Sequence, residues 1–236
     1  MRDQYAGDVS DVIKFAFLRA LARQDRTLGV AWYYVPGNDG SQDGQHLEWM
    51  KEPAWRSLDG ELQAGLSSLP ERSVAALERA PIWPTGTCFH RAPVPAGPGR
   101  REWCAGKRTA LGDADLVFLD PDKGVGEASA EHAAFAEVEA LRRPGRSIVF
   151  IKFPGRTKHD DQVRQLHQRL RDETGTASIL TLRTNISVPS KSRPGLYVQR
   201  QRWFTVVDAD VVLTARSKIF ASSLSAVPRV RAQIDF

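Results

Sequence analysis

Three short apolar runs, at residues 28–35, 116–119 and 147–153, are the clearest elements in the pattern of hydrophobic and polar positions. Each run is continuous rather than alternating, and each stops at a proline or an aspartate. A continuous run of this length is typical of a strand that is buried on both faces, as in a parallel sheet. We therefore predict three central strands of one sheet.

The amino-terminal segment repeats its apolar residues with the spacing of a helix. These residues are Val12, Ile13, Ala16, Phe17, Ala20 and Leu21. Asp8 or Ser10 can accept hydrogen bonds from the first free backbone N–H groups, so the predicted helix begins at one of them and ends near Arg23. Further helices are predicted at residues 46–51, 61–67, 71–79, 130–141 and 160–173.

Strands and helices alternate from residue 28 to residue 182, which predicts an α/β fold. We expect a Rossmann-like three-layer sandwich, in which a mostly parallel sheet has helices on both faces. Three later strands are predicted at residues 177–184, 202–207 and 211–214, and the last two form a C-terminal antiparallel hairpin through residues 208–210. The whole chain is predicted to be one domain, with an insertion rich in proline and glycine at about residues 81–100.

Composition is that of an ordinary globular protein. Hydrophobic residues make up 42% and charged residues 26% of the chain, and no apolar stretch approaches the roughly 18 residues that a membrane helix needs. The first residues lead into a charged amphipathic segment, which is unlike a secretory signal. Cys88 and Cys104 lack the spacing of a zinc site, so we expect reduced thiols, a cytoplasmic location and no membrane partner.

The net charge of +5 is distributed unevenly. Residues 142–158 contain six Lys or Arg and residues 183–202 contain five, and neither stretch contains an acid. Such stretches either bind phosphates or form a solvated basic surface. The predicted nucleic-acid-binding residues are Arg156, Lys158, Lys191 and Arg193, with DNA and RNA both open as partners.

The strongest indication of a functional site is the end of the apolar run at 116–119. Asp120, Pro121 and Asp122 follow it directly. Pro121 cannot extend a central strand, so Asp120 is expected at the carboxyl end of the strand, where open α/β sheets bind ligands. A carboxylate there can accept a hydrogen bond or act as a base. We predict Asp120 and Asp122 as catalytic residues, the alternative being an ordinary polar turn.

Two other polar clusters are candidates for binding a cofactor. One comprises Tyr5, Gly7, Asp8, Asp11 and Lys14, at the start of the first predicted helix, where Lys14 lies one turn from Asp11. The other is the loop 36–44, with Asp39 and Gly40 after the first predicted strand. The alternatives are a capped helix start with one salt bridge, and a solvated turn.

Several familiar motifs are missing from the sequence. It has no G-x-G-x-x-G fingerprint for a nicotinamide or flavin cofactor, no P-loop and no Gly-x-Ser-x-Gly nucleophile elbow. The five histidines form no motif. These absences disfavour dehydrogenase, NTPase and hydrolase-triad functions.

The chain resembles the adenine-N6 methyltransferases of large-subunit ribosomal RNA and related S-adenosylmethionine-fold proteins, including the three-Cys-motif partner group. It is still more similar to a bacterial and phage group that opens with Gly-Asp-x-x-Asp-x-x-Lys-Phe/Tyr and carries Asp-Pro-Asp-x-Gly. The matching residues are Tyr5, Ala6, Gly7, Asp11, Lys14, Asp115, Leu116, Asp120 and Pro121.

This resemblance implies a Rossmann-like methyltransferase with S-adenosylmethionine as cofactor and a nucleic acid as substrate. It places the Lys14 region around the cofactor and Asp120 toward the methyl acceptor. The chain departs from the Asp/Asn-Pro-Pro-aromatic motif of amino-group methyltransferases, because Asp122 replaces the second proline and Lys123 and Gly124 supply no aromatic ring.

Two alternative functions remain open from the sequence. A cluster of Asp8, Asp11, Asp120 and Asp122 would suit Mg²⁺ or Mn²⁺ in a phosphoryl- or glycosyl-processing enzyme. A non-catalytic nucleic-acid-binding module on the same fold is the other. All three hypotheses share one geometric expectation, that Asp120 and Lys14 face the same hollow.

Overall fold

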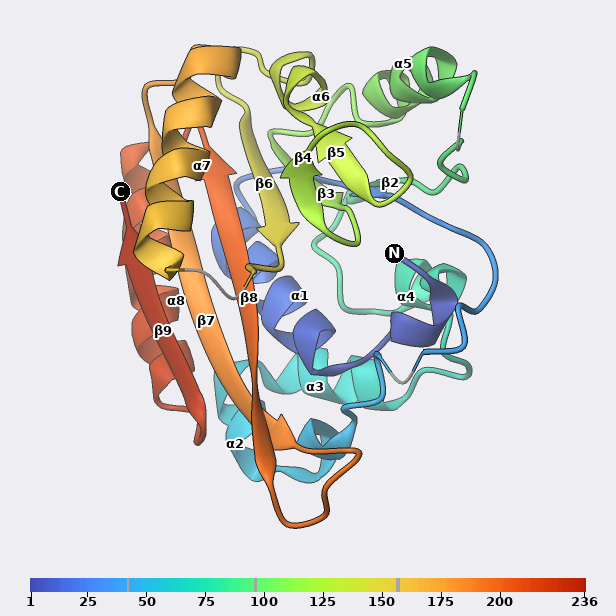
Figure 1. Ribbon diagram of the computed structural model, residues 1–236, viewed down its shortest axis with the longest axis vertical. Helices are drawn as coiled ribbons and strands as arrows, with labels where there is room; N and C mark the ends of the chain where they lie inside the picture. The colour runs from blue at the N-terminus through green and yellow to red at the C-terminus, as the bar shows by residue number, and fades with distance from the viewer. Residues whose placement is uncertain (42, 96, 156–157) are drawn as a thin grey trace.

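Seven strands form the central sheet of the computed structural model, which describes residues 1–41, 43–95, 97–155 and 158–236. The strand order is β2-β1-β3-β6-β8-β7-β9. The four strands β2 Cys88–His90, β1 Leu28–Trp32, β3 Leu116–Asp120 and β6 Ser147–Lys152 are mutually parallel. Helices cover both faces of this sheet (Figure 1). The predicted α/β fold with a mostly parallel sheet is therefore confirmed.

The continuous apolar runs are explained by two hydrophobic cores, one on each face of the sheet. In β3, Phe118 packs in one core and its neighbours Val117 and Leu119 pack in the other. Because side chains alternate along a strand, a strand between two cores needs an apolar residue at every position.

The first core is covered by α1 Val9–Ala22, α2 Pro53–Leu58, α3 Gly60–Ser67, α4 Val74–Arg79 and α8 Val211–Ser225. The second is covered by α5 Arg100–Ala110, α6 Phe135–Glu139 and α7 His159–Thr174. Short 3-10 turns, η1 Asp3–Tyr5 and η2 Glu48–Lys51, and the small pair β4 Gly124–Gly126 and β5 His132–Ala134 complete the described elements. Among the described helices, none has the length and apolarity to cross a membrane.

The carboxyl-terminal part differs from the prediction in detail. The antiparallel hairpin consists of β7 Ile179–Pro189 and β8 Tyr197–Val207, and β9 Val230–Asp235 pairs with β7. The predicted strand at 211–214 is wrong, because these residues begin α8. Asp210 accepts a hydrogen bond from the Leu213 N–H at 2.8 Å and thereby caps this helix. A short β-branched run does not by itself distinguish a strand from a helix. Here the capping aspartate favours the helix.

The other predicted elements agree with the structure to different degrees. The helices predicted at 8–23 and 160–173 correspond to α1 and α7. The helix predicted at 130–141 is reduced to α6, since β5 occupies its first part. The prolines and glycines of residues 81–100 flank an edge strand, β2, and the helices α2 and α5 were not predicted.

Replacing Asp210 by alanine is expected to destabilise the protein by about 1 kcal/mol, because the first turn of α8 loses its capping acceptor. Chemical denaturation measures the change in the free energy of unfolding. Asp172→Ala is the matched control, since this aspartate is exposed near the end of α7 and caps nothing. Its effect should stay within about 0.5 kcal/mol. Equal losses in the two variants would show that the cap contributes nothing.

Candidate functional site

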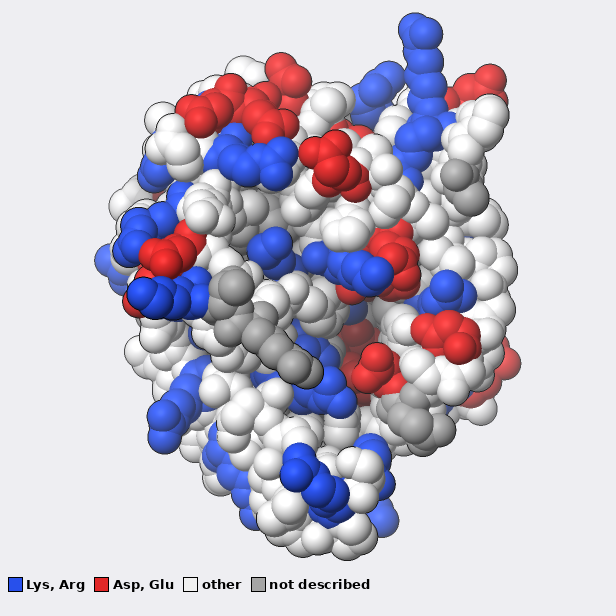
Figure 2. All heavy atoms as spheres, in the orientation of Figure 1, with Lys and Arg blue, Asp and Glu red and all other residues white. Residues whose placement is uncertain are grey.

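A cavity of about 800 Å³ lies at the edge of the sheet where β3 and β6 end. The start of α1, the loop after β1, the loop after β3 and the outer part of β8 form its walls. Figure 2 shows a hollow in the middle of this face, with basic side chains on one side and acidic side chains on the other. The edge matches the expected position of a ligand crevice in an open α/β sheet.

Lys14 and Asp120 meet inside this cavity, as the sequence led us to expect. Lys14 Nζ lies 2.9 Å from Asp120 Oδ2 and 2.7 Å from Asp11 Oδ1. All three side chains are buried. A lysine from the first helix therefore joins two carboxylates, one from its own helix and one from the end of the central strand β3.

Local structure explains how α1 presents this lysine. Asp8 accepts a hydrogen bond from the Ser10 N–H at 2.7 Å and so fixes the first turn of the helix. Asp11 lies on the same side of the helix as Lys14, three residues earlier, and its other oxygen accepts the Gly7 N–H at 2.8 Å. Gly7 has φ +78°, a conformation that favours glycine.

The electrostatics of this group combine burial with ion pairing. Burial raises the pKa of Asp11 to about 6, although the charge of Lys14 opposes this effect. Burial by itself would lower the pKa of Lys14, but the charges of Asp11 and Asp120 outweigh it and the pKa rises above its usual value. Lys14 is therefore a permanent ammonium, and it pairs with both Asp11 and Asp120.

The loop after β1 is tied to the amino-terminal segment. Asp39 accepts hydrogen bonds from the Tyr5 hydroxyl and from the Gln4 side chain, both at 2.6 Å. The hydrogen bond from Tyr5 holds the pKa of Asp39 well below its usual range. Burial, followed by the contact with Asp39, raises the pKa of Tyr5. Asp39 is thus an anion at the mouth of the cavity.

The second aspartate of the Asp-Pro-Asp sequence faces the same cavity. Asp122 Oδ1 lies 2.5 Å from the Met1 amino group, which also donates to the Tyr33 carbonyl at 2.6 Å. Lys123 pairs instead with Glu131, at 2.5 Å. The two predicted catalytic carboxylates, Asp120 and Asp122, therefore have different cationic partners.

Sequence reasoning did not select several polar lining residues, among them Ser10, His46, Arg200 and Arg202. Arg202 donates to Ser10 Oγ at 2.7 Å and lies 4.6 Å from the Phe153 ring, while Arg200 is 3.8 Å from Asp43. Burial, reinforced by the charge of Arg200, lowers the pKa of His46, so its imidazole is neutral at pH 7. The arginines lie in the acid-free stretch 183–202, which was the available signal.

Several predicted site residues do not line the cavity. Gly7 is buried and Gly40 is exposed, and neither is among the residues that line the cavity. Lys158 precedes α7. Lys191 and Arg193 are in the exposed turn between β7 and β8, where Lys191 pairs with Glu48 at 2.6 Å. Arg156 lies outside the described residues.

The proposed metal cluster is not assembled. Within the described ranges, no group of three or more His, Cys, Asp or Glu side chains has the arrangement of a metal site. The Lys14 ammonium lies between Asp11 and Asp120, where a shared cation would have to bind. The electrostatic role that the metal hypothesis gave to Mg²⁺ is filled here by a lysine.

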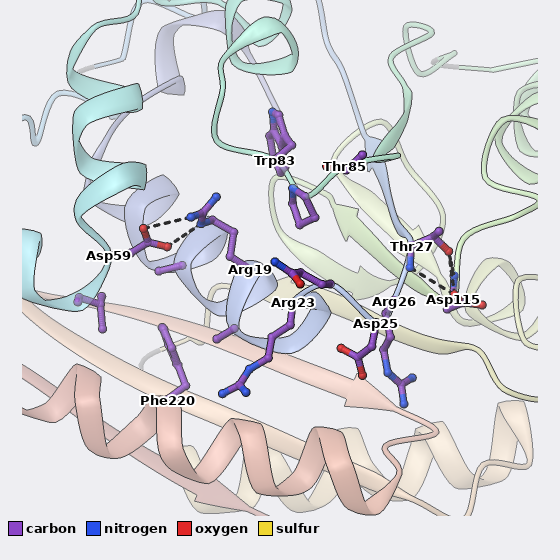
Figure 3. A pocket seen from close by; sticks show the side chains of 15 residues that line it. Arg19, Arg23, Asp25, Arg26, Thr27, Asp59, Trp83, Thr85, Asp115 and Phe220 are labelled. Carbon is purple, nitrogen blue, oxygen red and sulfur yellow. Dashed lines mark hydrogen bonds and ion pairs between the residues drawn. The ribbon is translucent and has the colours of Figure 1, made fainter.

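A second cavity, of about 850 Å³, lies at the opposite edge of the sheet, near residues that precede β1 and β3 (Figure 3). Most of its charged groups are already paired. Arg19 binds Asp59 at 2.6 Å, and Asp115 accepts from the Thr27 hydroxyl at 2.8 Å. Ligands of open α/β sheets bind at the carboxyl ends of the strands, so we assign the candidate site to the first cavity.

Comparison with known proteins shows a shared fold. No family model and no curated protein matches the chain in sequence. In structure, the chain is similar to protein LPL1258 of Legionella pneumophila, from the DUF519 family, with a TM-score of 0.51, 13% identity and coverage of 98% of this chain and 97% of that one.

Two methyltransferases are more distant structural matches. Precorrin-6y C5,15-methyltransferase of Geobacter metallireducens has a TM-score of 0.37 at 11% identity, over 85% of this chain and 88% of that one. A SAM-dependent methyltransferase of Agrobacterium tumefaciens has a TM-score of 0.35 at 12% identity, over 85% and 61%.

Proposed function

We propose that this protein is an S-adenosylmethionine-dependent methyltransferase that acts on nucleic acid. The observation that carries the proposal is the 2.9 Å contact between Lys14 Nζ and Asp120 Oδ2 in the cavity at the carboxyl ends of the parallel strands. These two residues, from distant parts of the chain, are central to the sequence resemblance to methyltransferases. Their contact is consistent with the site that the resemblance implies.

The charges of the cavity fit this cofactor. S-adenosylmethionine carries an amino group, a carboxylate and a ribose diol, and when bound it supplies a methyl group on a positively charged sulfur. Asp8 and Asp39 provide anionic acceptors on the amino-terminal side, together with the Tyr5 hydroxyl. On the opposite side, the Arg202 guanidinium is bonded to neutral oxygens, so it can receive an anion.

Asp120 has the position of the residue that orients the methyl acceptor. Its carboxylate can accept a hydrogen bond from an N–H or O–H of the substrate and can take up the proton that the acceptor loses. Lys14 holds this carboxylate in place. Asp11 is bonded to Lys14 and to backbone, so it acts as a positioning residue. Methyl transfer needs mainly alignment, which such a rigid group provides.

The basic side of the cavity favours an anionic substrate. Arg200 and Arg202 line it, and the exposed Lys158, Lys191 and Arg193 extend the basic surface. Positive groups around a substrate-sized cavity attract and hold phosphates.

Isothermal titration calorimetry with S-adenosylmethionine tests the proposal directly. We expect a dissociation constant on the order of 10 μM, and an affinity about tenfold weaker in Asp39→Asn, which loses an anion at the cavity mouth. Asp113→Asn is the control, because this aspartate lies at the opposite edge of the sheet, just before β3. Failure of the wild-type protein to bind the cofactor at about 1 mM overturns the proposed function.

A further inference from the structure

The β7–β8 hairpin extends well beyond the body of the sheet. β8 pairs with β6 only through Trp203–Val207, whereas its pairing with β7 continues to Pro189 opposite Tyr197. We call residues 184–202 the β7–β8 ribbon. Figure 1 shows it projecting past the end of β6 and over the helices of the first core. The ribbon runs from the candidate site to an exposed tip.

Positive charges lie at both ends of the ribbon. The ribbon contains four Lys or Arg and no acid. Arg202 lies in the cavity, Arg200 lines it nearer the outer end of the strand, and Lys191 and Arg193 are at the tip. Among the described residues, Arg202 has no carboxylate within ion-pair distance, and its partners are Ser10 Oγ and the Gln201 carbonyl. The ribbon therefore retains the capacity to bind an anion at its inner end.

The spacing of the two inner arginines suits a polymer. Residues 200 and 202 point to the same face of β8 and are about 6.6 Å apart along an extended strand. This separation is comparable to that of successive phosphates in an extended nucleic-acid strand. A small anion would need only one of these guanidinium groups.

The tip has an exposed apolar surface on the other face of the ribbon. Leu196 and Tyr197 are 50% and 46% exposed. Because side chains alternate along β8, Tyr197 faces away from Arg200 and Arg202. The Arg229 guanidinium covers one side of the Tyr197 ring at 4.4 Å. The two inner arginines therefore form a binding surface that does not include this ring.

We propose that the β7–β8 ribbon is the track for a single-stranded segment of the substrate. Arg202 and Arg200 bind phosphates next to the target nucleotide, on the face of β8 that lines the cavity. Single-stranded substrate is favoured because Arg202 lies against Ser10 and Phe153 within a cavity of about 800 Å³, which admits a nucleotide but not a duplex. The inference rests on the proposed function in taking nucleic acid as the substrate.

Fluorescence anisotropy with a labelled 20-nucleotide strand, as RNA and as DNA, and with the corresponding duplexes tests the ribbon. We expect the wild-type protein to bind at least one single strand about tenfold more tightly than its duplex. Arg200→Gln should weaken single-strand binding roughly tenfold, whereas Tyr197→Ser, on the opposite face of β8, should leave it within twofold of wild type. Arg200→Gln should also reduce the slope of log affinity against log salt by about 0.7.

Arg101→Gln is the matched control, since it removes the same charge from an exposed position on α5, away from the ribbon. It should leave binding within twofold of wild type. Tighter binding of the duplex, equal effects of Arg200→Gln and Arg101→Gln, or no binding of any strand each overturns the ribbon inference. Cofactor binding is measured separately by calorimetry. If S-adenosylmethionine binds but the ribbon variants have no effect, the proposed function stands and the substrate binds to another surface. If S-adenosylmethionine does not bind, the proposed function itself fails.

Discussion

Replacing Lys14 by methionine is expected to lower the free energy of unfolding by about 3–5 kcal/mol, the largest stability effect in this protein that we anticipate. The reason is electrostatic. Methionine fills much of the space of lysine, but it leaves the buried carboxylates of Asp11 and Asp120 without their shared cation. Two like charges then remain close together with little solvent, and one of them must take up a proton.

The pH dependence of this loss identifies its cause. Burial already raises the pKa of Asp11 to about 6, and Lys14→Met removes the charge that opposes this rise, so the folded-state pKa of Asp11 lies further above its unfolded value. The folded variant therefore binds more protons than the unfolded chain, and its stability falls as the pH rises from about 4 through the raised pKa. The difference in the free energy of unfolding between Lys14→Met and wild type should be smaller at pH 5 than at pH 8, as measured by urea denaturation at each pH.

Lys218→Met provides the matched control, because Lys218 is exposed on α8 and has no carboxylate partner among the described residues. Its stability should stay within about 0.5 kcal/mol of wild type at both values of pH. A loss in Lys14→Met that is independent of pH would indicate a packing defect rather than two unpaired acids.

Replacing Asp120 by asparagine is expected to reduce methyl transfer by about 100- to 10,000-fold, while the affinity for S-adenosylmethionine stays within about threefold. Asparagine preserves the shape of the side chain and can still accept from Lys14, but it cannot take up a proton. The measurement is the transfer of labelled methyl groups from S-adenosylmethionine to total RNA and total DNA, with calorimetry for cofactor affinity.

Asp115→Asn serves as the control, because Asp115 immediately precedes the same strand at the opposite edge of the sheet and binds Thr27. We expect its activity within threefold of wild type. Equal activity of Asp120→Asn and wild type would remove Asp120 from the chemistry. Nucleic-acid binding without measurable turnover in any form of the protein would favour the non-catalytic module.

The predicted first helix and the end of β3 show how far local patterns reach. Asp8 was one of two expected capping residues, and it caps α1. The end of the apolar run was expected to coincide with the end of a strand, and β3 ends at Asp120. Both predictions rest on interactions within a few residues, namely a helix cap and the missing N–H of Pro121.

The residues around α8 and β8 show where local patterns fail. Residues 211–214 have the composition of a strand but form the first turn of a helix, because Asp210 caps it and one face of α8, with Leu213, Phe220 and Leu224, packs on the first core. Arg202 was one of many arginines in a basic stretch. Only the structure shows that its partners are neutral, while Arg183 in the same stretch is paired with Asp235 at 2.7 Å.

The sequence by itself therefore determined the fold class, the two-sided burial of the central strands and the place of Asp120 at the end of one of them. These properties depend on the order of apolar and polar residues, which is local. The tertiary structure decided which distant charges are in direct contact, since the sequence predicted only a shared hollow for Lys14 and Asp120. Lys14 and Asp120 are 106 residues apart, and Ser10 and Arg202 are 192 apart. Their contacts arise from the strand order and from the packing of α1 against the sheet. In a buried site, the stability of each charged group depends on its neighbours in space, and these neighbours lie far away along the chain.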